Sequence, residues 1–233
     1  MPGATYIARR GEIETYFDRT ARDAWAKLTS EAAVGRVRAT VRAGRDEMRT
    51  TLLSWLPADL TGARILDAGC GTGALATEAA RRGADVVGID LSPNLIAIAG
   101  ERSAEMALSG RLTFLAGDML DPALGRFDHV VGMDSLIHYD RPDILRVAET
   151  LAARTERSLL FTFAPRTPAL AAMHAVGRLF PRGDRAPAIQ PVGTAALLEG
   201  ISASDGLAAW RVGRSHRVAR GFYISQAVEL VRL

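Results

Sequence analysis

The stretch ILDAGCGTG, residues 65–73, decides the fold class of this chain of 233 residues. A short apolar run leads into a turn that holds Gly69, Gly71 and Gly73. An apolar run of this length predicts a buried strand, and glycines in a turn let the backbone come close to a ligand. Taken alone, the stretch leaves three ligands open: a dinucleotide, a nucleotide phosphate or another adenosine-bearing cofactor.

Beyond this stretch, apolar runs and helical spacing alternate as far as residue 165. The runs typical of strands are 64–69, 85–90, 112–118, 127–134 and 158–165. Helical spacing is found at 74–83, 92–106 and 141–154. Ser92 is a typical N-cap and Pro93 a typical first helical residue. Alternating strands and helices predict an α/β fold, with a mostly parallel sheet and helices on both faces.

Four segments are expected along the chain. Residues 1–60 have helical spacing and no strand pattern, so they are expected to form an N-terminal helical arm. Residues 61–165 form the cofactor-binding core. The proline- and arginine-rich residues 166–196 are expected to form an inserted lid. Residues 197–233 return to a helix and two strands that complete the sheet.

Composition narrows the class of protein. No apolar run approaches the ~18 residues of a membrane-spanning helix, and residues 1–17 lack a hydrophobic signal core, so we expect a cytoplasmic protein. Cys70 is the only cysteine, which excludes an internal disulfide and a thiolate metal site. A net charge of +3 with 6% aromatic residues favours no nucleic-acid partner. Arginine supplies almost all of the positive charge and suits a carboxylate-bearing substrate.

Three acids at the ends of consecutive runs discriminate between the ligands. No Gly-Lys-Ser/Thr follows the turn, which excludes a Walker loop, and Ala74 breaks the dinucleotide pattern Gly-x-Gly-x-x-Gly. Asp90 ends the second strand-like run, where a carboxylate can accept both hydroxyls of a ribose. Asp118 ends the third, where it can hold an adenine edge, and Asp67 lies where a cationic amino-acid group would sit. A dinucleotide site has no regular need for Asp118.

The pattern Asp67-x-Gly69-x-Gly71-x-Gly73, followed by Asp90 and Gly117-Asp118, resembles the class I S-adenosylmethionine-dependent methyltransferases. The resemblance covers roughly residues 64–165. It implies a Rossmann-like, seven-stranded, mostly parallel sheet whose last strand is antiparallel, and S-adenosylmethionine as methyl donor. The cofactor-binding residues expected on this basis are Asp67, Gly69, Cys70, Gly71, Gly73, Asp90, Leu91, Ser92, Asp118, Met119 and Met133.

A narrower resemblance runs nearly the whole length of the chain. The segments YFDRTARDAWAKL (16–28) and DSLIHY (134–139), with the prolines before LLEG, resemble the magnesium-protoporphyrin O-methyltransferases. That family transfers a methyl group to a propionate of the magnesium porphyrin in chlorophyll and bacteriochlorophyll synthesis. Its arm pattern is Tyr-Phe-Asn followed by Trp-x-x-Ile-Tyr, whereas this chain has Asp18 and Thr29 at two of those positions. The role of the second tyrosine therefore does not carry over, and Tyr16 is the candidate substitute.

The chemistry of such an ester requires positioning more than a base. A carboxylic acid with a pKa of about 4 is already ionised at neutral pH. His138 is the candidate for orienting the propionate, with a packed structural histidine as an equal alternative. His129 and Tyr139 are expected to be structural. The arginines expected mainly on a solvated face, with one or two binding propionates, are Arg36, Arg38, Arg42, Arg166, Arg178 and Arg182.

The resemblance also implies partners. The substrate is a magnesium porphyrin, a magnesium chelatase subunit is the expected protein partner, and so apolar a substrate fits peripheral association with the photosynthetic membrane. No protein-bound metal is expected. Three other functions stay open: another small-molecule methyltransferase acting on an oxygen or nitrogen, such as one for a quinone precursor; a non-catalytic cofactor-binding scaffold; and a nicotinamide oxidoreductase, which Ala74 and Asp118 disfavour.

Overall fold

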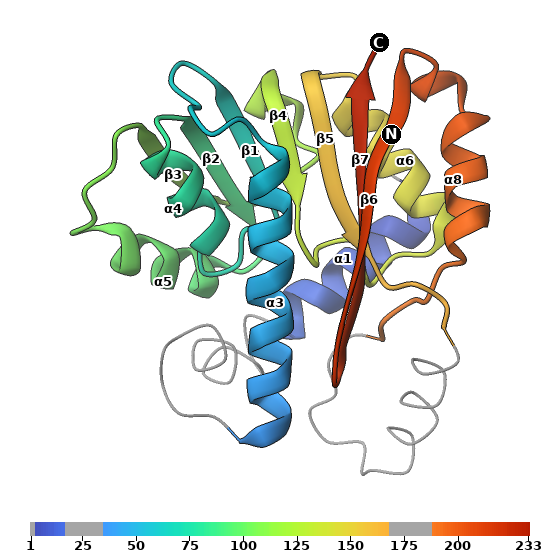
Figure 1. The fold of residues 1–233 in the computed structure, drawn as a ribbon, viewed down its shortest axis with the longest axis horizontal. Coiled ribbons are helices and arrows are strands. Elements are labelled where there is room, and N and C mark those ends of the chain that lie inside the picture. Colours follow the sequence, from blue (N-terminus) through green and yellow to red (C-terminus); the bar gives the residue numbers. More distant parts are fainter. Residues whose placement is uncertain (1–2, 17–34, 168–187) are drawn as a thin grey trace.

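The computed structural model describes residues 3–16, 35–167 and 188–233, which contain a seven-stranded sheet (Figure 1). Across the sheet the strands follow the order β3-β2-β1-β4-β5-β7-β6. Their bounds are β1 Arg64–Ala68, β2 Asp85–Asp90, β3 Arg111–Ala116, β4 Phe127–Gly132, β5 Thr155–Phe163, β6 Trp210–Arg220 and β7 Tyr223–Arg232. Strands β1 to β5 pair in parallel, and β7 is antiparallel to both β5 and β6. This is the class I methyltransferase fold, as predicted.

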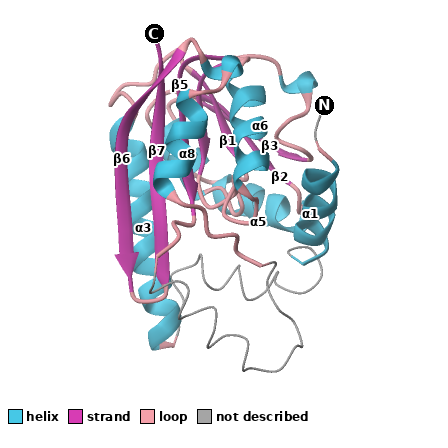
Figure 2. Ribbon diagram, turned by 90° about the vertical axis from the view of Figure 1, so that its right-hand side faces the viewer, coloured by secondary structure: helices cyan, strands magenta, loops and turns pink. Residues whose placement is uncertain are grey.

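Helices cover both faces of the sheet. Their bounds are α1 Ala4–Thr15, α3 Arg36–Trp55, α4 Ala74–Arg81, α5 Pro93–Ser103, α6 Arg141–Ala152 and α8 Thr194–Ser202. Figure 2, a view turned by 90°, shows α3 and α1 on opposite sides of the sheet. Successive strand residues alternate between two cores: Ile65 belongs to the core to which α3 and α4 contribute, whereas Leu66 belongs to the core to which α1, α6 and α8 contribute. The strand period of two therefore accounts for the continuous apolar runs, since both faces are buried.

The sequence predicted the elements of the core closely. Each expected strand is present, and the helix expected at 92–106 ends at Ser103. It begins as expected, because the Ser92 hydroxyl accepts a hydrogen bond from the Leu95 amide. The arm is helical in its described parts, α1 and α3. Most of the expected lid, 168–187, and the arm residues 17–34 lie outside the described residues, so the division into four segments stays a prediction.

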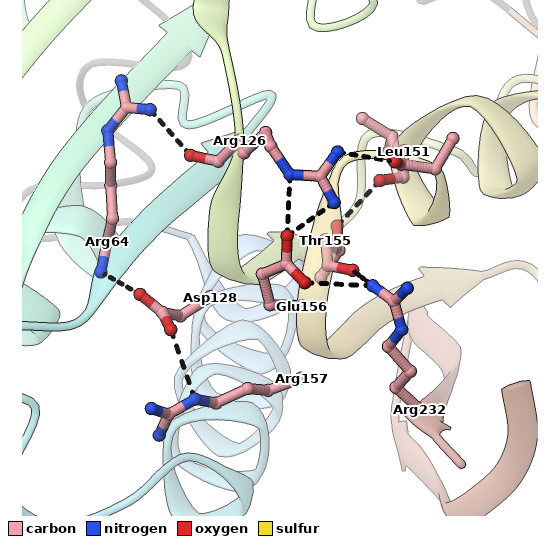
Figure 3. Close-up of polar contacts among 9 residues, drawn as sticks. Arg64, Arg126, Asp128, Leu151, Thr155, Glu156, Arg157 and Arg232 are labelled. Atoms are coloured by element: carbon pink, nitrogen blue, oxygen red, sulfur yellow. Dashed lines mark hydrogen bonds and ion pairs between the residues drawn. The ribbon is translucent and has the colours of Figure 1, made fainter. Parts of the chain in front are cut away.

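The two ends of the sheet differ in their surroundings: polar contacts link the strands at the amino ends, and the carboxyl ends lie where a ligand would bind. At the amino ends of β1, β4 and β5, a hydrogen bond joins β1 to β4 and ion pairs join β4 to β5 (Figure 3). Asp128 accepts from the Arg64 amide at 2.9 Å and pairs with Arg157 at 3.2 Å, and Glu156 pairs with Arg126 at 2.5 Å. The carboxyl ends of these strands lie beside α1 and the middle of α3. Ligands of open parallel sheets bind at the carboxyl ends, here where the order reverses between β1 and β4.

No helix in the described ranges is long and apolar enough to cross a membrane.

Candidate active site

A cavity of about 680 Å³ opens at the carboxyl ends of β1 to β4, and helices α1 and α3 complete its lining. It brings together most of the residues predicted from the sequence. The predicted residues in the lining are Asp67, Gly69, Cys70, Gly71, Asp90, Leu91, Asp118, Met119, Met133, Tyr16 and His138. Gly73 and Ser92 are not among the lining residues. We call the side formed by the ends of β1, β2 and β3 the strand wall, and the side formed by α1 and α3 the helix wall.

The glycine turn can be built only with glycine at two positions. Gly69 and Gly73 have φ angles of 83° and 80°, a region that side chains disfavour. A Cβ atom at Gly69 would lie 2.5 Å from the Cβ of Ser135, and one at Gly73 would lie 2.5 Å from the ring of Phe114. Gly69 thus keeps the turn close to the β4 end, whereas Gly73 serves the packing of α4 on β3.

Asp90 is held at the mouth of the turn by two backbone amides. Its carboxylate accepts from the Gly71 amide at 2.9 Å and from the Ser92 amide at 3.0 Å. Burial raises the pKa of Asp90, while these amide bonds act in the opposite direction. Each carboxylate oxygen has two lone pairs, so the oriented group can still accept the two hydroxyls of a ribose. Ser92 is fully buried and acts as the cap of α5.

Asp67 lies deeper in the strand wall, with 1% of its surface exposed. It accepts from the Ala76 amide in the first turn of α4 at 3.0 Å, and burial raises its pKa to about 7. A cationic ligand group beside it would favour the ionised form and lower that pKa. Asp67 is thus suited to an ammonium group.

Cys70 contributes to the turn through its backbone. Its amide and that of Gly69 both donate to the Ile89 carbonyl, at 2.9 and 2.8 Å, which joins the turn to β2. Burial raises the pKa of the Cys70 thiol. The thiol is therefore neutral at physiological pH and unsuited to act as a nucleophile.

Asp118 has partners that the sequence did not reveal. The Tyr6 hydroxyl and the Arg10 guanidinium, both on α1, donate to its two oxygens at 2.8 Å each. Burial raises the pKa of Tyr6, so its hydroxyl keeps the proton that it donates. The Tyr6 ring also stacks on Tyr139 with centroids 5.0 Å apart. Asp118 fastens α1 over the strand wall, and its expected contact with adenine stays a prediction.

The two candidate catalytic residues both line this cavity, although they are far apart in the sequence. His138 lies in the loop between β4 and α6 and is 6% exposed, and Tyr16 directly follows α1. Met119 and Met133, both 8% exposed, add apolar surface beside the ends of β3 and β4. His129, by contrast, lies within β4 with Nδ1 2.7 Å from the Ser158 hydroxyl, as expected for a structural histidine.

The helix wall carries charges that sequence reasoning largely missed. Arg42, Arg45 and Arg49 line the cavity from α3, and of these only Arg42 was a candidate. Arg45 forms an ion pair of 2.5 Å with Asp134, directly beyond the end of β4. The spacing of three and four residues indicates a shared helix face, but not what that face meets.

Among the described side chains, no three His, Cys, Asp or Glu residues are grouped so that they could hold a metal ion. The expectation of no protein-bound metal stays a prediction.

Comparisons with known proteins give consistent results. Residues 132–232 match the family described as magnesium-protoporphyrin IX methyltransferase C-terminus, and residues 65–157 match the family described as methyltransferase domain. The chain is 52% identical to a magnesium-protoporphyrin O-methyltransferase of Rhodobacter capsulatus, over 98% of this chain and 99% of that protein. It is 30% identical to a magnesium-protoporphyrin O-methyltransferase of Synechocystis, over 94% of this chain and 95% of that protein.

A solved structure gives the same result. The crystal structure of magnesium protoporphyrin IX methyltransferase from Synechocystis PCC 6803 with bound SAH (S-adenosylhomocysteine) superposes with a TM-score of 0.83. It is 28% identical and covers 95% of this chain and 98% of that one. The similarity therefore extends beyond the core to the arm and the C-terminal strands.

Proposed function

This chain belongs to the magnesium-protoporphyrin O-methyltransferase family, and we propose that it transfers a methyl group from S-adenosylmethionine to a propionate of magnesium protoporphyrin IX. The observation that carries the proposal is one cavity that joins the glycine turn and Asp90 to His138. The first two features suit an adenosine cofactor, and the third lies where an acceptor would meet it. The 52% identity to the Rhodobacter capsulatus relative supports the choice of acceptor.

The residues of the strand wall fit the cofactor. Gly69 lines the cavity without a side chain, so the turn would let the cofactor approach its backbone closely. Asp90 would hold the ribose hydroxyls, Asp67 the amino group, and the apolar surface of Leu91, Met119 and Met133 the adenine. When bound, the cofactor supplies a methyl carbon on a sulfonium, which an ionised carboxylate oxygen attacks as the sulfur departs.

The remaining contribution of the chain is to position and dehydrate the acceptor carboxylate. The acceptor carboxylic acid has a reference pKa of about 4 and is already ionised at neutral pH, so a strong general base is unnecessary. His138 orients the carboxylate by a hydrogen bond, and Tyr16 supplies a second polar contact near the same space. Apolar lining residues such as Ile13, Leu95 and Ile137 exclude water. Orientation and desolvation of this kind account for several kcal/mol of a displacement barrier, on the order of 7–11 in favourable cases.

Labelled cofactor tests the proposal directly. Purified protein, incubated with methyl-labelled S-adenosylmethionine and magnesium protoporphyrin IX, is expected to yield a labelled monomethyl ester. The His138→Ala variant should lose about 100-fold in kcat, the usual cost of a misplaced reactant, while keeping its affinity for S-adenosylhomocysteine. Absence of the ester, with labelling of a phenolic quinone precursor instead, would support the alternative acceptor class. Full physiological function in both His138→Ala and Asp90→Ala would support a scaffold.

We further propose cytoplasmic placement with peripheral membrane association, and a magnesium chelatase subunit as a partner. The apolar, water-insoluble substrate supports both, because it must be passed on without release into water. Co-sedimentation with anionic vesicles, and pull-down by the purified subunit, test the two parts separately. Recovery of the protein only in the unbound fraction would contradict each.

A further inference from the structure

The cavity has a charge of opposite sign on each of its two sides. The strand wall presents Asp67, Asp90 and Asp118. The helix wall presents Arg42, Arg45 and Arg49, which share one face of α3 because they are three and four residues apart. Asp46 also lies on this face and pairs with Arg49 at 2.8 Å. The acidic side suits a cationic cofactor, and the basic side suits an anionic acceptor.

Arg45 is held in place by an ion pair to the loop that follows β4. Its guanidinium lies 2.5 Å from the Asp134 carboxylate, and the exposed fractions of the two side chains are 19% and 6%. Asp134 in turn accepts from the hydroxyls of Tyr223 at 2.9 Å and Thr162 at 3.3 Å. This network holds Arg45, on α3, against Asp134, which lies on the same loop after β4 as His138.

The backbone conformation of Asp134 also indicates that its side chain is held in a particular place. Its φ of 57° is the only positive value at a non-glycine residue in the described chain. Its amide donates to the Thr162 hydroxyl at 2.7 Å, which helps to hold this disfavoured conformation. Strained residues of this kind cluster at ligand-binding sites, where the strain places a side chain.

The porphyrin has two propionates, and only one of them is methylated. We propose that Arg45, positioned by Asp134, binds the other propionate, which stays a free carboxylate. The inference rests on the proposed function. A guanidinium has five N–H donors, so it can bind a ligand carboxylate in bidentate fashion while it keeps its bond to Asp134. Arg45 is thus a specificity residue, and Asp134 is a positioning residue.

The charge change of the reaction determines which propionate Arg45 binds. The reacting carboxylate loses its negative charge as the ester forms, so a cation bound to it would stabilise the substrate more than the transition state. The other carboxylate keeps its charge throughout. An arginine bound there stabilises substrate and transition state equally, which lowers KM and leaves kcat unchanged.

Two porphyrin esters isolate this contact. Magnesium protoporphyrin IX monomethyl ester and dimethyl ester differ only in the carboxylate assigned to Arg45. Titration of the full-length protein, followed by porphyrin absorbance, should show that Arg45→Met weakens binding of the monomethyl ester by about 10- to 100-fold. Binding of the dimethyl ester should change by less than about twofold, as should S-adenosylhomocysteine binding. Arg38→Met is the matched control, because Arg38 is exposed on the same helix outside the cavity lining.

Kinetics with the dicarboxylate substrate give a second readout. Arg45→Met should raise KM by a similar factor with kcat nearly unchanged, and Asp134→Asn should shift KM in the same direction by less. Equal loss of affinity for both esters, or a fall in kcat at constant KM, would overturn the inference, since a purely structural pair predicts those results. Loss confined to the unesterified substrate would also overturn it by placing Arg45 on the reacting carboxylate. A different result would refute the proposed function: wild-type protein that binds the monomethyl ester but does not methylate magnesium protoporphyrin IX.

Discussion

The strand wall and the helix wall of the cavity are built by different means. The strand-wall acids lie within two residues of the carboxyl ends of their strands, and each accepts from at least one backbone amide, as Asp90 does from those of Gly71 and Ser92. Two side chains of the helix wall are instead held by side chains far away in sequence, Tyr6 by Asp118 and Arg45 by Asp134. The strand wall therefore belongs to the fold, whereas the helix wall depends on how two helices dock.

The difference matters for function. A cofactor shared by a superfamily can be bound by groups that come with the fold. An acceptor particular to one family needs residues that can vary without disturbing the sheet. Helices docked by side-chain contacts meet that need, which explains why the carboxylate-binding residue proposed above lies on α3.

Removing one strand-wall acid gives the largest expected effect. Asp90→Ala deletes the carboxylate that orients the Gly71 and Ser92 amides and that would accept the ribose hydroxyls. Loss of charge-assisted hydrogen bonds costs about 1.5–3 kcal/mol each, so affinity for S-adenosylhomocysteine should fall by at least about 100-fold. Isothermal titration calorimetry measures the change.

The matched control for Asp90→Ala is Asp85→Ala, an acid at the amino end of the same strand. Because that end of the strand lies away from the cavity, the affinity of the Asp85→Ala variant for S-adenosylhomocysteine should stay within about twofold of wild type. Equal losses in the two variants would show that the strand, and not the position of the acid, decides binding.

The sequence was informative about the strand wall for physical reasons. A buried strand, a glycine turn and an acid at a strand end are local patterns, so Asp67, Gly69 and Asp90 could be located before the structure was known. Tyr6 and Arg10 could not, because their partner Asp118 lies more than 100 residues away. The arginines show the same limit. Arg38 and Arg42 were equal candidates four residues apart on α3, but only Arg42 lines the cavity, since helical spacing does not say how far along a helix face a cavity extends.

The pH dependence of cofactor binding should show an intermediate effect. Burial raises the pKa of Asp67 to about 7, so this carboxyl is mostly protonated in the free protein at pH 6. A cationic amino group needs it ionised, and binding below the pKa must release a proton. Affinity for S-adenosylhomocysteine should therefore rise with pH, by up to about tenfold per unit below pH 7, and level off above it.

The stability of the free protein should change in the opposite sense. The folded state binds the Asp67 proton more tightly than the unfolded state, whose pKa is near 3.9. This contribution is full below about pH 4 and is lost as pH rises to 7. Asp67→Asn should flatten both profiles. A binding profile in Asp67→Asn with the wild-type slope would assign the titration to another group, such as Asp90.

The smallest expected effect tests how the helix wall is attached. Tyr6→Phe removes the hydroxyl that donates to Asp118 but keeps the ring stacked on Tyr139. The free energy of unfolding, measured with urea, should fall by about 1.5 kcal/mol, the low end of the range for a hydrogen bond to a charged group, because Asp118 keeps its bonds from Arg10 and the Leu120 amide. Ile7→Ala, at an exposed position of the same helix, should change it by less than about 0.5 kcal/mol.

The same variant distinguishes the two walls in cofactor binding. The strand-wall carboxylates keep their amide partners when α1 loosens, so S-adenosylhomocysteine affinity of Tyr6→Phe should stay within about threefold of wild type. The rates of association and dissociation should both rise, because a less firmly held α1 opens the cavity more often. Stopped-flow measurements separate the two rates. A loss of affinity as large as that of Asp90→Ala would mean that α1 binds the cofactor itself, and the helix wall would then serve both ligands.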